Sequence, residues 1–151
     1  MRRIVDLDWQ DIETALRDQN GTETYIDVET GDLIRVAPGF SDEAQLRSTV
    51  EDDRDRYLRL PVIDTAFAHR VMLQFIDSIA DNSVKAELQR AFGKTGPYTR
   101  CIGVLQLYPP LLAAFRHKEK RALWRHFEAY LRAHSMAPST PPPDMGPHDE
   151  Q

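Results

Sequence analysis

AFGKTGPYTRCIGVL, residues 91–105, is the stretch around which the chain is organised. Gly93 follows an apolar helical pattern and predicts a helix end in the left-handed conformation, which glycine adopts without steric cost. Gly96 then lets the chain turn, and Pro97 suits the first position of a new helix, where no amide donor is needed. The stretch therefore predicts a corner between helices at 84–92 and 97–107.

Two cations, Lys94 and Arg100, flank this corner. A glycine turn at the start of a helix can bind phosphate, because the amides and the helix dipole both favour an anion. The strand and the full spacing of a nucleotide-binding P-loop are absent. We interpret the corner as structural first, and we keep Lys94 and Arg100 as candidate anion-binding residues.

Four features follow one another along the chain in a recognisable order. They are the hairpin YIDVETG at 25–31, the segment YLRLP at 57–61, the helix pattern Met72-x-x-Phe75-Ile76, and Ala-Phe-Gly-x-x-Gly-x-Tyr-x-Arg at 91–100. This order resembles the bacterial Uncharacterised Protein Family 0158 over about residues 5–133. The resemblance implies a shared fold. The family has no assigned activity, so the resemblance implies no catalytic residues.

Length and composition predict one globular domain over residues 1–134. The chain has 151 residues, 41% of them apolar, which is enough for a real core. No run is long enough to span a membrane, and the N-terminus lacks the apolar core of a signal peptide. A lone cysteine excludes an internal disulfide framework. We expect a cytoplasmic protein without a cofactor.

Charge is distributed unevenly along the chain. Residues 1–83 hold nine Lys/Arg against eighteen Asp/Glu, a formal charge of −9. Residues 84–134 hold ten against three, a charge of +7, and residues 135–151 hold three acids alone. The acidic and basic parts could attract each other, or the basic part could meet an anionic partner.

Local signals predict an α+β fold in which a small antiparallel sheet of about three strands packs against four to five helices. Asp8, Asp64 and Ser83 are predicted helix caps, and Asn20-Gly21 ends the first helix. Gly31 takes the left-handed position of a hairpin turn. A disordered Pro-rich tail is predicted at 135–151. The predicted strands are the hairpin 23–36 and a third strand at 57–60. Residues 37–55 are predicted as a loop that could hold one short helix near 43–48. The later helices are 65–80, 84–92, 97–107 and 111–133, the last continuous or broken near Lys118.

The last helix carries the best candidate for a binding surface. Its cations could follow a phosphate backbone, and Trp124 and Tyr130 could stack on bases. The spacing of Trp124, Phe127 and Leu131 instead favours a core stripe, and no known nucleic-acid-binding pattern is present. With Lys94 and Arg100, the candidate residues for an anion or nucleic acid are Arg116, Lys118, Lys120, Arg121 and Arg125.

No catalytic or metal-binding constellation is predicted. The five histidines form no i, i+4 pair of the kind that helical zinc sites use. Cys101 lies beside Arg100, which would lower its pKa, but its helix face is apolar, so we expect a buried, unreactive thiol. An acidic run that includes Asp52 and Asp53 favours a solvated loop; as a cation site it would suit metal-dependent phosphoryl transfer.

These observations predict a non-enzymatic adaptor or regulator whose partner is another protein. The first alternative is a nucleic-acid-binding accessory protein that uses the basic helix. The second alternative is a metal-dependent phosphoryl-transfer enzyme that uses the acidic run. The sequence leans against an enzyme because it contains no recognisable catalytic group.

Overall fold

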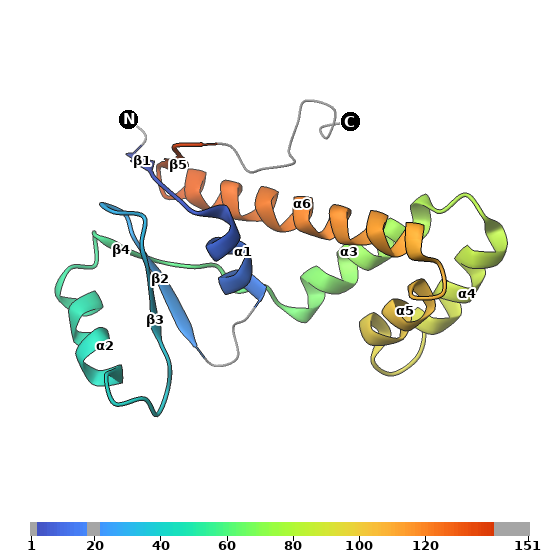
Figure 1. Ribbon diagram of the computed structural model, residues 1–151, viewed down its shortest axis with the longest axis horizontal. Helices are drawn as coiled ribbons and strands as arrows, with labels where there is room; N and C mark the ends of the chain where they lie inside the picture. Colours follow the sequence, from blue (N-terminus) through green and yellow to red (C-terminus); the bar gives the residue numbers. More distant parts are fainter. Residues whose placement is uncertain (1–2, 18–21, 141–151) are drawn as a thin grey trace. The chain divides into compact units, whose positions relative to one another are not determined.

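The computed structural model describes residues 3–17 and 22–140. The chain is α+β, and contacts divide it into two compact units (Figure 1). The first unit comprises the chain up to Val62 and from Leu123 onward, and the second comprises Ile63–Ala122. The described residues form six helices, more than the four to five predicted. The prediction of a single domain over 1–134 stays a prediction.

The first unit contains a three-stranded antiparallel sheet in the order β3-β2-β4. The central strand β2 (Glu23–Asp27) pairs on one side with β3 (Leu33–Val36) and on the other with β4 (Tyr57–Arg59). The predicted hairpin and third strand are confirmed. Helix α2 (Glu43–Asp52) packs against β3 and is longer than the predicted helix at 43–48.

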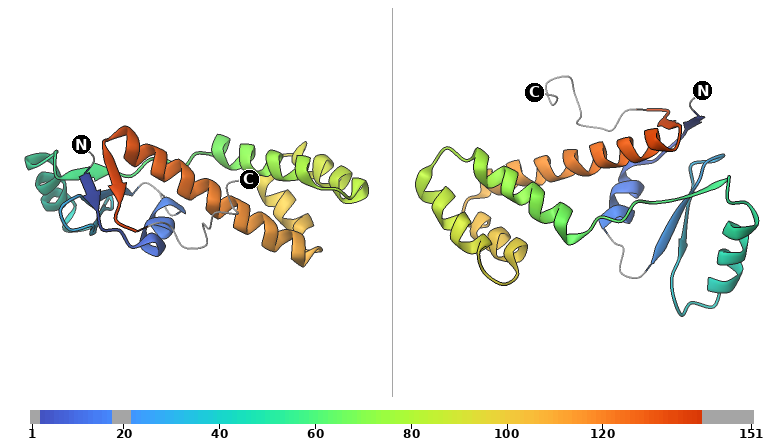
Figure 2. Two further views of the ribbon diagram at one scale, coloured as in Figure 1. Left: turned by 90° about the horizontal axis from the view of Figure 1, so that it is seen from above. Right: turned by 180° about the vertical axis from the view of Figure 1, so that it is seen from behind.

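The first unit also contains a second, two-stranded sheet that the sequence analysis missed. Strand β1 (Arg3–Val5) runs parallel to β5 (Met136–Pro138), as Figure 2 shows. The predicted tail is therefore wrong at β5, because that backbone is held in a strand. The adjoining residues add two hydrogen bonds, Arg3 N–H to Ser135 O and Ser139 N–H to Val5 O, both 2.8 Å. The rest of that predicted tail, 141–151, lies outside the described residues.

Helix α1 (Trp9–Arg17) packs on the C-terminal part of α6 (Pro109–Ala133) within this unit. The Trp9 ring meets Trp124 and Phe127 edge-on, with ring centroids 6.1 and 5.8 Å apart. Trp124, Phe127 and Leu131 are buried, so the predicted core stripe is confirmed, while the matching role of Trp9 was missed. Asp8 caps α1 as predicted. The predicted helix end at Asn20-Gly21 lies outside the described residues.

The second unit is helical, with α3 (Thr65–Ser78), α4 (Asn82–Phe92) and α5 (Pro97–Leu105) packed together. Phe115 of α6 is fully buried, and its ring lies 5.3 Å from that of Phe75. Asp64 caps α3 as predicted. The predicted cap Ser83 is wrong: Asp81 caps α4, because its carboxylate accepts from the Ser83 and Val84 amides. Helix α6 runs through Lys118 without a break.

The corner between α4 and α5 turns at Gly96 and not at Gly93. Gly93 keeps a right-handed φ of −75°, and its amide still donates to Gln89 O, so the prediction for Gly93 is wrong. Gly96 has φ +67° and precedes Pro97, as that part of the prediction requires. Cys101 is fully buried in α5, and burial raises the pKa of its thiol. This environment fits the expectation of an unreactive thiol. The lowering of the Cys101 pKa expected from Arg100 is wrong.

Candidate functional site

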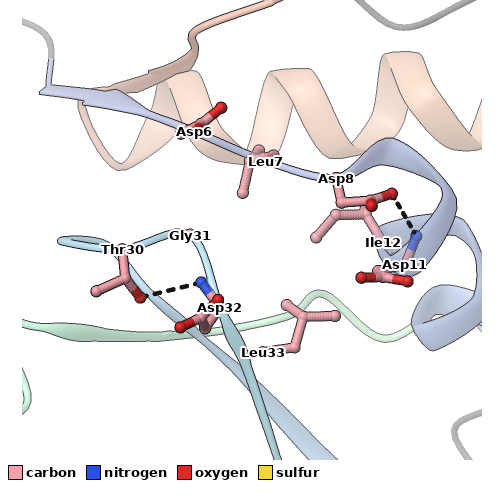
Figure 3. Close-up of a pocket in the computed structure, with 9 residues that line it drawn as sticks. All are labelled: Asp6, Leu7, Asp8, Asp11, Ile12, Thr30, Gly31, Asp32 and Leu33. Carbon is pink, nitrogen blue, oxygen red and sulfur yellow. Dashed lines mark hydrogen bonds between the residues drawn. The ribbon is translucent and has the colours of Figure 1, made fainter.

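The first candidate site is a cleft of about 420 Å³ in the first unit, between two chain segments (Figure 3). One segment is the connection from β1 into α1, residues 6–12. The other is the turn of the β2–β3 hairpin with the first residue of β3, residues 30–33. The cleft is lined by Asp6, Leu7, Asp8, Asp11, Ile12, Thr30, Gly31, Asp32 and Leu33.

Gly31 sets how closely these two segments approach. It has φ +83°, and a Cβ placed on it would lie 1.5 Å from the backbone oxygen of Asp6. Its amide donates to Asp27 O at 2.7 Å, which closes the hairpin turn. Only a residue without a side chain fits both the left-handed backbone and this contact. The left-handed turn was predicted from the sequence, whereas the contact with Asp6 was not.

The carboxylates of the cleft are placed by local backbone chemistry. Asp8 Oδ1 accepts from the Gln10 and Asp11 amides at 3.0 and 3.2 Å, which caps α1. Asp6 Oδ1 accepts from the Ser139 hydroxyl at 3.0 Å, and its side chain points away from the hairpin in Figure 3. Asp8, Asp11 and Asp32 are exposed and pair with no Lys or Arg within 3–17 and 22–140. Their negative charge is therefore available to a ligand.

A second cavity of about 690 Å³ continues the first along α1 and the edge strand β3. The two share Asp11, Asp32 and Leu33, so we treat them as one groove, called here the acidic groove. Together they are lined by five aspartates and one arginine, Arg35, which has a partner of its own. The second cavity adds Thr14, Ala15, Asp27, Ile34 and Arg35 to the lining.

Asp27 lines the second cavity, is buried and is neutralised by Arg56. The guanidinium donates from Nε to Oδ1 at 3.0 Å and from Nη2 to Oδ2 at 2.9 Å. This bidentate contact, together with the Glu29 amide, holds the pKa of the Asp27 carboxyl below its ordinary value. Asp27 therefore anchors the hairpin turn, and the exposed carboxylates of Asp8, Asp11 and Asp32 supply the charge that a ligand would meet.

The structure brings together two of the residues predicted to bind an anion. Lys94 and Arg100 line one cavity of about 370 Å³ in the second unit, at the α4–α5 corner. Arg90, which the sequence analysis did not single out, lines it as well. Arg90 lies in the last turn of α4, four residues before Lys94, so its closeness to the corner could have been found in the sequence. The Arg100 Nε also donates to Thr95 O at 2.7 Å.

The basic residues of α6 are placed differently. Arg116 contacts the buried carboxylate of Glu119 at 3.4 Å and the Tyr98 hydroxyl at 3.2 Å. The Tyr98 hydroxyl also donates to Glu119, so burial and this bond raise the pKa of Tyr98 to about 12. Arg116 thus compensates an internal charge. Of the others, Lys118, Lys120 and Arg121 are half-buried, and Arg125 is exposed in the first unit.

The acidic run lies at the end of α2 and in the following turn, and its members Asp52 and Asp53 are exposed. In the described part of the chain, no three Asp, Glu, His or Cys side chains gather closely enough to hold a metal ion. The phosphoryl-transfer alternative therefore has no metal site among those residues, and it stays a prediction from sequence alone.

Comparison with known proteins gives no relative: no protein-family model, curated protein or solved structure matches the chain. The resemblance to Uncharacterised Protein Family 0158 therefore stays a prediction. Among the helices of the described residues, none combines the length and the apolar character that a membrane crossing requires.

Proposed function

We propose that this protein is a non-enzymatic adaptor that binds a basic segment of a partner protein in the acidic groove. One observation carries the proposal: three aspartates that line a single groove in the first unit, Asp8, Asp11 and Asp32, are exposed and pair with no Lys or Arg among the described residues. Asp11 and Asp32 occupy its centre, since both cavities share them. Lys or Arg side chains of a partner are the natural counterpart of such a lining.

The shape and floor of the groove favour an extended peptide. Leu33 and Ile34 line the groove and are half-buried, so apolar side chains of a bound segment would find contacts there. The groove also follows β3, an edge strand of the sheet. An extended peptide can add to such an edge, with alternate side chains reaching the floor. A partner segment that alternates basic and apolar residues fits both features.

The charge of the whole unit supports the same partner class. The first unit holds ten Lys/Arg against nineteen Asp/Glu, a formal charge of −9, while the second unit is at +4. A surface of one sign attracts an oppositely charged partner over distances of about 10 Å at moderate salt. Recognition by the first unit should therefore weaken as salt is raised.

The test is fluorescence anisotropy with a labelled peptide that alternates lysine and leucine, added to the full chain. The double variant Asp11→Asn, Asp32→Asn should weaken binding about tenfold or more, since one charge contact near 4 Å in water is worth about 1 kcal/mol. The matched control is Asp52→Asn, an exposed aspartate on α2 outside the groove. It should leave the affinity unchanged.

Two results would refute the proposal. One is equal weakening by the control and the double variant, which would mean general charge attraction. The other is unchanged binding in the double variant. The alternative prediction, nucleic-acid binding by α6, is tested with a labelled oligonucleotide in the same assay: an affinity that falls steeply with salt and disappears in Arg121→Glu, Arg125→Glu would support it.

A further inference from the structure

We infer that the cavity at the α4–α5 corner, called here the corner pocket, binds the phosphate group of a small organic phosphate. This inference goes beyond the proposed function and concerns the other structural unit. The corner pocket has a volume of about 370 Å³ and is lined by Glu87, Arg90, Ala91, Lys94, Arg100, Gly103, Val104 and Leu107.

The pocket is made by the last turns of α4, the corner and α5. On the α4 side, Glu87, Arg90 and Ala91 lie on one helical face, and Lys94 follows just beyond the end of the helix. On the α5 side, Arg100, Gly103 and Val104 share a helical face, and Leu107 follows beyond the end of α5. Arg90, Lys94 and Arg100 therefore line a single space.

The charges of the pocket favour an anion. Arg90 and Lys94 contact no carboxylate among the described residues, and Arg100 bonds only a carbonyl, Thr95 O, through its Nε. The one acid in the lining, Glu87, accepts a hydrogen bond from the Tyr108 hydroxyl at 3.1 Å. Three cations therefore face one acid that already has a donor. A phosphate is the common biological anion that uses several such donors at once.

Gly103 supplies an independent observation. It lies inside α5 without a positive φ, and a Cβ added to it would meet nothing within 4 Å. Glycine in a helix interior is unfavourable relative to alanine, and no turn or close backbone contact within 3–17 and 22–140 requires it here. A bare backbone on the wall of a cationic pocket leaves room for a ligand to approach closely.

The ligand should have an organic part beyond its phosphate. The pocket is larger than a phosphate ion, and its wall includes Ala91, Val104 and the 69% exposed side chain of Leu107. Such volumes and mixed linings are typical of small-molecule sites. A nucleic acid is a poorer match, because the acidic Glu87 lines the pocket and Arg116 of α6 is engaged with Glu119.

The test is an amide chemical-shift titration of the full chain with phenyl phosphate, and separately with inorganic phosphate, at constant ionic strength. We expect saturable shifts confined to residues 87–107, with phenyl phosphate binding more tightly than inorganic phosphate. Arg100→Gln should weaken phenyl phosphate about fivefold, the value of one charge contact near 4 Å in water. Gly103→Leu should abolish binding while the chain keeps or gains thermal stability, because leucine favours helix and fills the pocket.

Lys85→Gln is the matched control, since it removes a cation from the same helix outside the pocket, where Lys85 contacts Asp77 O. It should bind phenyl phosphate as the unchanged chain does. Equal weakening by Lys85→Gln and Arg100→Gln would overturn the inference, as would the absence of saturable shifts. A single-stranded oligonucleotide that binds the same residues more tightly than phenyl phosphate would overturn it in favour of nucleic acid. The acidic-groove variants are in the other unit, so failure here is distinguishable from failure of the adaptor proposal.

Discussion

Replacing Gly31 by alanine should destabilise the first unit severely, and the reason is the contact between the hairpin turn and Asp6. The added Cβ would lie 1.5 Å from Asp6 O and 2.7 Å from the Asp6 carbonyl carbon. Ordinary contact begins near 3.4 Å, so the two backbones would have to separate by almost 2 Å. Both sides of this contact line the acidic groove.

The cost has two parts. An L-residue in the left-handed region costs roughly 1–2 kcal/mol. Moving Asp6 would also pull its neighbours Val5 and Leu7 out of the core, where they are 1% and 6% exposed. Losing the burial of even one such side chain costs about 1.5–3 kcal/mol. We therefore expect a total loss of roughly 4 kcal/mol, among the largest effects of a single substitution.

Gly39→Ala is the matched control for the backbone part. Gly39 has φ +84°, almost the value of Gly31, but nothing lies within 4 Å of its added Cβ. The free energy of unfolding of Gly39→Ala should fall only by the cost of a left-handed alanine, about 1–2 kcal/mol. The difference between the two variants therefore isolates the contact with Asp6.

The assay is urea unfolding followed by tryptophan fluorescence. Both tryptophans of the chain, Trp9 and Trp124, lie in the first unit with ring centroids 6.1 Å apart, so the signal reports this unit. With a slope of about 2 kcal/mol per M, the midpoint of Gly31→Ala should lie roughly 1 M or more below that of Gly39→Ala. Equal midpoints would refute the contact between Gly31 and Asp6.

Three further predictions concern charges, caps and pH. Arg56→Met should lower the free energy of unfolding, measured with urea, by about 2–3 kcal/mol, because it leaves the buried carboxylate of Asp27 without its bidentate donor. A decrease of less than about 0.5 kcal/mol would contradict this geometry. Asp81→Ala should lower the free energy of unfolding by about 1 kcal/mol, whereas Ser83→Ala should change it little. A larger decrease for Ser83→Ala than for Asp81→Ala would mean that Ser83 is the cap, as the sequence predicted. The pKa of Tyr98, about 12, lies above its ordinary value of 10.0. The stability that its neutral hydroxyl contributes should therefore be complete below pH 10 and lost as the pH rises toward 12. An ultraviolet titration in which this phenol ionises at its ordinary pKa would contradict the buried hydrogen bond.

Short-range backbone chemistry made much of the fold predictable. Asp8 and Asp64 cap helices because a carboxylate satisfies amides two or three residues ahead, and this information is contained in a few consecutive residues. Gly31 and Gly96 take positive φ values at turns that the sequence marks. The stripe of Trp124 and its neighbours predicted a buried face because helical periodicity places such residues together.

The candidate sites were less predictable, because each depends on side chains that the fold brings together. The sequence predicted Lys94 and Arg100 as binding residues at the corner. The roles of Arg90 and Gly103 follow only from the structure, in which α4 and α5 line one pocket. Arg116 was assigned to a ligand. In the structure it pairs with Glu119, three residues further along its own helix, and tertiary packing adds the hydroxyl of Tyr98 from α5.

The sequence by itself determined the caps at Asp8 and Asp64, the turns at Gly31 and Gly96, the antiparallel hairpin and the apolar faces, since each follows from interactions between residues close along the chain. Only the tertiary structure decided the pairing of β1 with β5, whose partners Arg3 and Met136 are at opposite ends of the chain. It alone also decided the approach of Gly31 to Asp6, which creates the acidic groove. Such contacts depend on where the whole chain places distant backbone segments, and no local pattern of residue types encodes that position.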